Sequence, residues 1–393
     1  MKNTNNYKET VITGAEAATE AMRQINPDVV AAYPITPQTH IVEKYSELVA
    51  DGLVDTEFVP VESEHSALSC VIGAQAAGAR SMTATSSQGL AYMWEVLGVA
   101  SGMRLPILMP VVNRALSSPI NIHCDHSDSM GASDQGWIQI FCEDNQEVYE
   151  TMLLTIKLIE NNNILLPAMV LQDGFVTSHN AERVKIYNDN TIKKFIGEYQ
   201  PHQPLLDFNN PVSYGPLVLP DYQMEVKRQQ IEAMDNVIGE YQRVAKELKV
   251  ITKNNHSLFE EYKLIDARVA IITSSSTAGS VKYVVDELRK RGKKVGLLKI
   301  KLFRPFPYLE IFKALSHIKN IAVLDRAPGY GKNAPVYNEI LSSFVKNNKS
   351  VKIQSCIFGL GGRDIEIKQI DNVYQNLLAG KVNDKVKFIG LNE

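Results

Sequence analysis

Cysteine is scarce in this sequence. Its 393 residues include only four cysteines, and no two of them have C-x-x-C spacing. Iron–sulfur clusters, structural zinc sites and disulfide frameworks depend on cysteines at characteristic spacings. We therefore expect none of the three within this chain. The four residues are Cys70, Cys124, Cys142 and Cys356.

A long apolar run is also missing. The most apolar stretch, residues 98–112, is interrupted by Arg104 and by two prolines, whereas a helix needs about 20 apolar residues to cross a bilayer. The first residues, MKNTNN, contain no apolar segment of the kind found in secretory signals. We expect a cytoplasmic protein that has no membrane contact.

Neither sign of charge is in clear excess. The chain has 41 Lys and Arg against 44 Asp and Glu, a net charge of −3. Because nucleic-acid binding rests on a basic surface, we expect no nucleic-acid partner. Hydrophobic residues make up 45% of the chain and charged residues 22%, as in ordinary globular domains. A chain of this length is typical of two or three domains.

Short apolar runs alternate with helical stretches over residues 14–175. Strands that alternate with helices of roughly 10–15 residues are typical of βαβ units on a parallel sheet. We therefore expect residues 1–180 to form a doubly wound α/β domain. The expected strands are 29–33, 58–61, 81–85, 107–112 and 168–171, and the expected helices are 15–24, 41–50, 67–77, 90–100 and 148–160.

The composition changes after this region. Residues 181–258 contain proline- and asparagine-rich turns and then a charged helical stretch at 224–249, which predicts a linker with one long helix. The α/β alternation resumes at residue 268, so we assign residues 259–393 to a second α/β domain. Its expected strands are 268–273, 295–300, 321–325 and 351–358, and its expected helices are 277–291, 308–315 and 334–345.

Ligands of open parallel sheets bind beyond the carboxyl ends of the strands, so the residues after each strand are the candidates. After the first strand, YPITP holds the Thr36 hydroxyl at a strand–helix junction, either as a ligand contact or as the cap of the next helix. After the second strand comes ESEH. One carboxylate is favoured at a helix start, so the pair Glu62 and Glu64 leaves one glutamate for acid–base chemistry.

The third and fourth strands also end in polar groups. TSSQG at 85–89 opens a helix and either holds an anion or polar ring or forms an ordinary turn. Arg114 ends an apolar strand. Since guanidinium groups bind carboxylates, it is a candidate for binding a substrate anion, and an internal ion pair is the alternative.

Two loops are candidates with weaker signals. The donors of Asp125, His126, Ser127 and Asp128 are crowded and have no second cluster, so we expect this loop to line a site rather than to hold a metal. GLGGRD at 359–364 fits neither the dinucleotide nor the Walker pattern. We expect it to form a turn with positive φ rather than a phosphate loop.

Taken in order, these motifs resemble the alpha subunit of the multisubunit pyruvate:ferredoxin oxidoreductases, or pyruvate synthases, of the 2-oxoacid:ferredoxin oxidoreductase family. The resemblance covers nearly the whole chain and is weakest in the linker. The matching segments are YPITP (33–37), ESEHSA (62–67), GAQAAGAR (73–80), TATSSQGL (83–90), GMRLP (102–106), VNRAL (112–116), DHSDSM (125–130), GWIQ (136–139), EDNQE (143–147), DGFVTSH (173–179), FRPFP (303–307), Asp325-Arg326 and GLGGRDI (359–365).

The resemblance implies a fold and a set of partners. The first domain would be like the pyrimidine-binding domain of thiamine diphosphate enzymes, and the second like the C-terminal domain of transketolase. The cofactor would lie at an interface with a beta subunit that holds its diphosphate and Mg²⁺, beta and delta subunits would carry the [4Fe-4S] clusters, and a gamma subunit would complete the assembly. Independently, QDG at 172–174 lacks the G-D-G…N magnesium pattern, so we expect no metal on this chain.

The resemblance also implies residue roles in the oxidative decarboxylation of pyruvate with coenzyme A, with electrons passed to ferredoxin. Glu64 matches the glutamate that hydrogen-bonds the aminopyrimidine ring, and Thr36 and Arg114 match residues that bind the substrate. The loop 125–128 matches a signature near the active site, without individual roles. Further residues expected around the cofactor are Tyr33, Pro34, Ile35, Ser87 and Gln88.

Two departures from the family pattern leave the substrate open. ASDQ at 132–135 has no basic residue near position 133, and Cys124 precedes the DHSD loop. Branched-chain 2-oxoacids and oxalate are therefore alternative substrates of the same machinery. A less favoured alternative is the thiamine-dependent component of a 2-oxoacid dehydrogenase complex.

Overall fold

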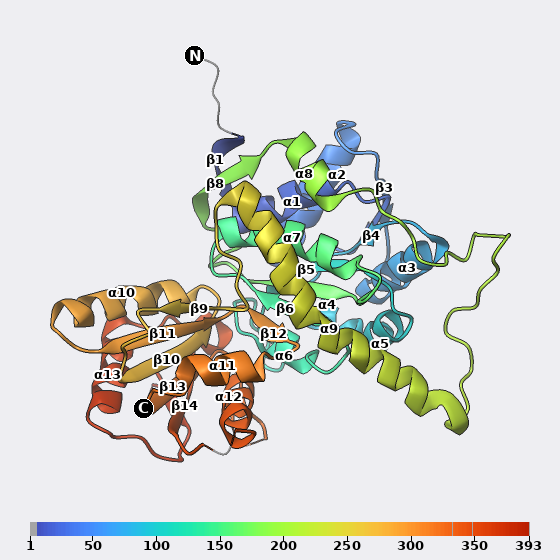
Figure 1. The fold of residues 1–393 in the computed structure, drawn as a ribbon. Coiled ribbons are helices and arrows are strands. Elements are labelled where there is room, and N and C mark those ends of the chain that lie inside the picture. Colours follow the sequence, from blue (N-terminus) through green and yellow to red (C-terminus); the bar gives the residue numbers. More distant parts are fainter. Residues whose placement is uncertain (1–5, 332, 348, 393) are drawn as a thin grey trace.

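Two parallel sheets, each covered by helices on both faces, form the framework of the protein (Figure 1). The computed structural model describes residues 6–331, 333–347 and 349–392. The first sheet has the strand order β12-β6-β7-β5-β4-β2-β3, and the second has the order β15-β14-β13-β10-β11-β9. The predicted α/β class with two domains is confirmed.

The strands of the first domain are short and parallel. Every residue of β5, β6 and β7 is buried, as expected where helices cover both faces of a sheet. The strands are β2 (Val29–Ala32), β3 (Glu57–Pro60), β4 (Ser81–Met82), β5 (Leu108–Asn113), β6 (Ile138–Phe141) and β7 (Ala168–Asp173).

The helices of this domain form two layers. One hydrophobic core contains residues of α1, α2 and α7, and another on the opposite face of the sheet contains residues of α3, α4 and α5. The predicted helix at 90–100 is in fact broken at Met93, between α4 and α5. The helices are α1 (Gly14–Ile25), α2 (Thr39–Ala50), α3 (Glu64–Ala77), α4 (Ser87–Tyr92), α5 (Trp94–Gly102), α6 (Ser127–Gly131) and α7 (Asn145–Ile159).

The segment predicted as a linker is more structured than expected. It begins with β8 (Ala181–Tyr187), which pairs antiparallel with β1 (Tyr7–Thr13), and continues into α8 (Asp189–Ile196), which packs on the first core. Strand pairing across about 170 residues leaves no local sequence pattern, and β1 contains mainly polar residues, so neither strand was predicted. The predicted long helix is α9 (Pro220–Thr252).

Helix α9 packs on the first domain mainly through its second half. Apolar side chains at helical spacing, including Val237, Tyr241 and Leu248, are fully buried in the first core. Residues 221–229 are exposed, and this end of the helix projects from the domain together with the preceding loop (Figure 1).

The sheet of the second domain has five parallel strands, with β15 at one edge, and one antiparallel strand, β9, at the other edge. The predicted strands and helices are present, whereas β9, α13 and β15 were not predicted. The elements are β9 (Phe259–Tyr262), β10 (Val269–Ser274), α10 (Thr277–Lys290), β11 (Val295–Ile300), α11 (Tyr308–Leu315), β13 (Asn320–Asp325), α12 (Pro335–Val345), β14 (Lys352–Phe358), the 3₁₀ turn η1 (Leu360–Gly362), α13 (Ile367–Leu378) and β15 (Lys387–Ile389).

The two domains are joined by backbone pairing and by buried charge. Strand β12 (Leu302–Arg304), which follows the second sheet's β11, pairs antiparallel with β6 and extends the first sheet. Beside it, the ammonium of Lys299 lies 2.9 Å from Glu147 Oε1 and 2.9 Å from Glu260 Oε2, and Lys301 lies 2.8 Å from Glu147. Lys299 and Lys301 are almost fully buried, so separating the domains would leave uncompensated charges.

No helix in the described part of the chain is both long and apolar enough to cross a membrane.

Candidate active site

Glu64 is the first residue of α3, at the carboxyl end of β3. The helix cap is Ser63, whose hydroxyl accepts a hydrogen bond from the Ser66 backbone nitrogen at 3.2 Å, and Glu62 accepts one from the Ser66 hydroxyl. Glu64 is therefore not needed to cap the helix. Only 7% of the residue is exposed, and no donor within the described residues hydrogen-bonds its carboxylate.

The wall beside Glu64 is made by Gly89 and Thr85. A Cβ atom placed on Gly89 would lie 2.8 Å from the Cγ and Oε1 atoms of Glu64 and 2.5 Å from Thr85 Oγ1, so only glycine fits between them. Thr85 Oγ1 is buried and has no hydrogen-bond partner among the described residues. Buried polar groups normally have partners, so this carboxylate and this hydroxyl retain capacity for a ligand.

Arg114 follows β5 and is 7% exposed. Its Nη1 donates a hydrogen bond to the backbone oxygen of Thr36 at 2.8 Å, and its Nε donates one to the backbone oxygen of Asn121 at 3.1 Å. Burial lowers the pKa of this guanidinium. No described carboxylate lies within 4.0 Å of its nitrogens, and Nη2 makes no hydrogen bond within the described chain. The internal ion pair considered above is therefore not formed.

The YPITP loop connects β2 to α2 and lies next to Arg114. Its conformation is held by the fully buried Gln38, whose Nε2 donates a hydrogen bond to Ala84 O at 3.0 Å. The residue before α2 is Gln38, and its side chain forms no capping bond, so Thr36 is not the cap of this helix. The exposed or half-buried residues of the loop are Tyr33, Pro34, Ile35 and Thr36.

Ser87 and Gln88 lie at the start of α4. The Ser87 hydroxyl lies 2.6 Å from Ala115 O and 2.6 Å from Gln88 Oε1, and its backbone nitrogen donates to Asp128 Oδ2 at 3.0 Å. Ser87 is fully buried and Gln88 half-buried. Ser87 therefore holds the loops after β4 and β5 together, while Gln88 remains partly accessible.

Asp128 joins three elements at this edge of the sheet. Besides Ser87, it accepts hydrogen bonds from the Arg114 backbone nitrogen at 3.0 Å and from Asn113 Nδ2 at 2.8 Å. Burial raises the pKa of Asp128 to about 6, although these hydrogen bonds oppose the rise. The residue thus ties the ends of β4 and β5 to α6.

The side chains of Asp125, His126 and Ser127 also form hydrogen bonds with other residues of this chain. Asp125 accepts hydrogen bonds from the Ser127 backbone and, across the domain boundary, from the Gly361 backbone nitrogen at 3.2 Å. His126 Nε2 lies 2.7 Å from Asp173 Oδ1. Ser127 Oγ accepts from the Leu116 backbone nitrogen at 2.9 Å. The loop connects the first domain to the second.

Cys124, His126 and Asp173 are buried with their potential ligand atoms within 4.8 Å of one another. Arg326 Nη1 lies 3.0 Å from Asp173 Oδ2, so this carboxylate already binds a cationic side chain. Burial raises the pKa of the Cys124 thiol well above its usual value, which disfavours the thiolate that metals prefer. The side chains of His126, Asp173 and Arg326 form a hydrogen-bond network between the domains.

The sequence analysis did not single out every residue of the site. Thr85 and Gly89 belong to the predicted TSSQG loop. The glycine of that motif was the sequence signal that could have pointed to them. Asn121 belongs to no motif, and its role depends on a contact with residue 361. The predicted positive φ in GLGGRD is confirmed, with 64° at Gly359, 60° at Gly361 and 82° at Gly362.

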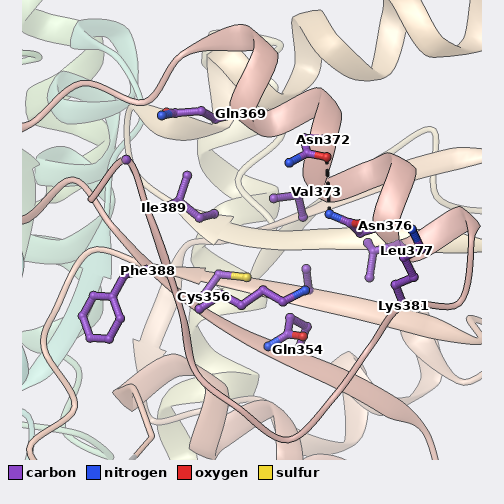
Figure 2. Close-up of a pocket in the computed structure, with 13 residues that line it drawn as sticks. Gln354, Cys356, Gln369, Asn372, Val373, Asn376, Leu377, Lys381, Phe388 and Ile389 are labelled. Atoms are coloured by element: carbon purple, nitrogen blue, oxygen red, sulfur yellow. Dashed lines mark hydrogen bonds between the residues drawn. The ribbon is translucent and has the colours of Figure 1, made fainter. Parts of the chain in front are cut away.

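A cavity of about 340 Å³ lies in the second domain between α13, β14 and the edge strand β15 (Figure 2). Cys356, Asn376 and Gln354 are among its lining residues. Gln354 is engaged by the backbone of residues 383 and 385, and none of the predicted site residues lines this cavity.

Two family models match this chain, one in each domain. Residues 20–246 match the family model described as pyruvate flavodoxin/ferredoxin oxidoreductase, thiamine diphosphate-binding, and residues 267–370 match pyruvate:ferredoxin oxidoreductase core domain II. All of the predicted site residues lie within the first matched region.

Relatives and solved structures match over nearly the whole chain. Pyruvate synthase subunit PorA of Thermotoga maritima is 51% identical over 97% of this chain and 98% of that protein, and PorA of Methanocaldococcus jannaschii is 46% identical over 98% of each. The ketoisovalerate oxidoreductase subunit VorA of Pyrococcus abyssi is 38% identical over 97% of each.

Two solved structures share the fold at low sequence identity. The 2-oxoglutarate:ferredoxin oxidoreductase of Magnetococcus marinus has a TM-score of 0.73 at 21% identity, covering 96% of this chain and 66% of that chain. A split-gene transketolase has a TM-score of 0.57 at 8% identity, covering 94% and 99%. With both domains matched in order and a relative more than half identical along their length, this chain belongs to the pyruvate:ferredoxin oxidoreductase family and carries its thiamine diphosphate-binding domain.

Proposed function

We propose that this chain is the alpha subunit of an enzyme that oxidatively decarboxylates pyruvate with coenzyme A. The products are acetyl-CoA and CO₂, and the electrons pass through iron–sulfur clusters of partner subunits to ferredoxin, in a reversible reaction. The observation that supports this most directly is the pair of Glu64 and Arg114. Both are buried at the carboxyl edge of one sheet, and neither side chain forms a salt bridge within the described residues.

Glu64 would hold the pyrimidine ring of thiamine diphosphate. Its buried carboxylate, with the unpartnered hydroxyl of Thr85 beside it, fits a ring that presents N–H donors. When bound, thiamine diphosphate supplies the carbon nucleophile and the electron sink for decarboxylation. Glu64 would accept a hydrogen bond at its carboxylate oxygen and so favour a proton on the facing ring nitrogen. Other residues proposed around the ring are Tyr33, Pro34, Ile35, Ser87 and Gln88.

Arg114 and Thr36 would bind the substrate. One edge of the Arg114 guanidinium is held by two backbone carbonyls, which leaves Nη2 for a carboxylate. A buried cation without a directly bound carboxylate is costly. The nearby charge of Asp128 acts on the guanidinium without contacting it, and the carboxylate of a 2-oxoacid would supply the direct contact. The exposed Thr36 hydroxyl, on the loop that Arg114 contacts, would bind the carbonyl end of the substrate.

Partner subunits would complete the site. Exposed aromatic side chains lie on or next to the elements that form the site, with 37% of Tyr33, 58% of Tyr92 and 50% of Trp94 accessible. We propose that a beta subunit covers them and provides the diphosphate and Mg²⁺ contacts, because Asp173 of the QDG segment is already engaged by His126 and Arg326. Gamma and delta subunits would complete the path to ferredoxin.

A substrate panel on the assembled complex tests this function. We expect viologen reduction that requires both thiamine diphosphate and coenzyme A and that is fastest with pyruvate. Branched-chain 2-oxoacids are the second candidate, because of the VorA relative, and oxalate is a third. Acylation of a lipoyl domain instead of viologen reduction would favour a dehydrogenase-complex component and would contradict the proposal.

A further inference from the structure

We propose that Asn121 is a positioning residue for Arg114 and that, through it, the glycine turn of the second domain determines how tightly the 2-oxoacid is bound. This inference rests on the proposed role of Arg114. It assigns a task to the turn at residues 359–362, which the proposed function leaves without one.

A chain of contacts joins the turn to the guanidinium. Asn121 Nδ2 donates a hydrogen bond to the backbone oxygen of Gly361 at 3.1 Å. The backbone oxygen of Asn121 in turn accepts the Nε–H of Arg114 at 3.1 Å. The side chain of Asn121 thus binds the second domain, while its backbone binds the arginine. Arg114 Nε has no other hydrogen-bond partner in the described chain.

The turn at residues 359–362 packs tightly against the segment at residues 121–123. A Cβ atom on Gly361 would lie 2.4 Å from Asn121 Nδ2, and a Cβ atom on Gly362 would lie 2.4 Å from His123 Cβ. Both glycines also have positive φ. The turn therefore needs glycine to admit the side chains of Asn121 and His123, which accounts for its composition without a phosphate ligand.

A second set of contacts holds the other end of the same segment. Gly361 N donates to Asp125 Oδ2 at 3.2 Å, and His126 N donates to the backbone oxygen of Arg326 at 2.7 Å. The segment is thus held to the second domain at residues 121, 125 and 126. In contrast, the exposed residues between Leu116 and Asn121 make few contacts. The first domain also holds the segment, because Ala115 N donates to the His123 oxygen at 3.0 Å. The side chain of Asn121, however, is hydrogen-bonded to the second domain, so the position of the Asn121 carbonyl depends on that domain.

Substitution of Asn121 and Gly361 in the assembled complex tests the inference. Asn121→Ala keeps the backbone acceptor but removes its anchor, and Gly361→Ala introduces a clash with Asn121. We expect either change to raise the KM for pyruvate about tenfold or more, since displacement of a binding group by about 1 Å can cost up to about 100-fold. The KM for coenzyme A and kcat should change little.

Gly292→Ala is the matched control. Gly292 lies in the same domain with φ of 73°, and nothing lies within 4 Å of an added Cβ, so this variant introduces similar backbone strain without the clash. It should leave the KM for pyruvate unchanged. A loss of active protein in Asn121→Ala at unchanged KM would show a merely structural role and would overturn the inference.

The double variant Arg114→Ala/Asn121→Ala separates this inference from the proposed function. If Asn121 acts through Arg114, the double variant should have the same KM as Arg114→Ala alone, because effects on one shared interaction do not add. Additive effects would overturn the positioning role while leaving the role of Arg114 intact. An unchanged KM in Arg114→Ala would instead contradict the proposed function itself.

Discussion

The imidazole Nε2 of His126 lies 2.7 Å from Oδ1 of Asp173, at the boundary between the two domains. The second oxygen of this carboxylate accepts a hydrogen bond from Arg326 Nη1 at 3.0 Å and another from Ser276. Burial by itself would raise the pKa of Asp173, but His126 and Arg326 outweigh it and hold this pKa well below its usual range. One fully buried carboxylate thus links both domains.

This relationship predicts acid sensitivity of the fold. Asp173 has a lower pKa in the folded than in the unfolded chain, so its contribution to stability is complete above about pH 4 and is lost as the pH falls further. The free energy of unfolding should therefore decrease as the pH falls below this value. Denaturant titrations at several pH values between 7 and 3 would measure it. Asp173→Asn should be less stable at pH 7 and should show a shallower decrease, and an identical slope would contradict the assignment.

Glu64→Gln should abolish most turnover while the complex still assembles. The amide is nearly isosteric but cannot favour a proton on the facing ring nitrogen, and acid–base groups contribute about 100-fold or more to rate. The measurement is kcat for viologen reduction with pyruvate. The control is the exposed Glu62→Gln, which should retain activity. Near-normal turnover in Glu64→Gln would refute the role of Glu64.

Arg114→Ala should raise the KM for the 2-oxoacid by roughly 10- to 100-fold, because a hydrogen bond to a charged group contributes about 1.5–3 kcal/mol. Added guanidinium ions at millimolar concentration should partly restore binding by filling the vacated place. The largely exposed Arg183, which forms only a 3.8 Å surface pair with Glu9, provides the control variant Arg183→Ala, for which no change is expected. Failure of guanidinium to lower the KM would argue against a direct contact.

Lys301→Met should destabilise the junction between the domains. Lys301 is 1% exposed and lies 2.8 Å from Glu147, and removal of one partner of a buried ion pair costs about 3–5 kcal/mol. Thermal unfolding would measure the loss. By contrast, Lys290→Met removes an exposed pair with Glu287 and should cost less than about 1 kcal/mol. Equal effects of the two variants would show that burial of the cluster does not matter.

Much of the architecture is readable from local patterns. Buried strands such as Leu108–Asn113 are continuous apolar runs, and the polar residues after each strand mark one edge of the sheet. Glu64, Thr36 and Arg114 were therefore recognisable as candidates before any coordinates, because each stands where a parallel strand ends. The family resemblance also follows from the order of these segments along the chain.

Other features depend on residues that are distant in the chain. Strand β12 joins the first sheet although it follows the second sheet's β11, and β1 pairs with β8 across about 170 residues. Such pairings leave no periodic signal in either segment. The same holds for Asn121 and Gly361, whose contact spans 240 residues.

The amino-acid sequence alone thus determines which polar side chains follow the strands, since side-chain type and strand ends are local properties. How those groups are engaged depends on packing between distant segments. The fold leaves the side chains of Glu64 and Arg114 without a salt bridge but surrounds Asp173 with His126 and Arg326. Burial and proximity, which arise when the two domains meet, separate the carboxylates and cations available to a ligand from those that hold the fold together.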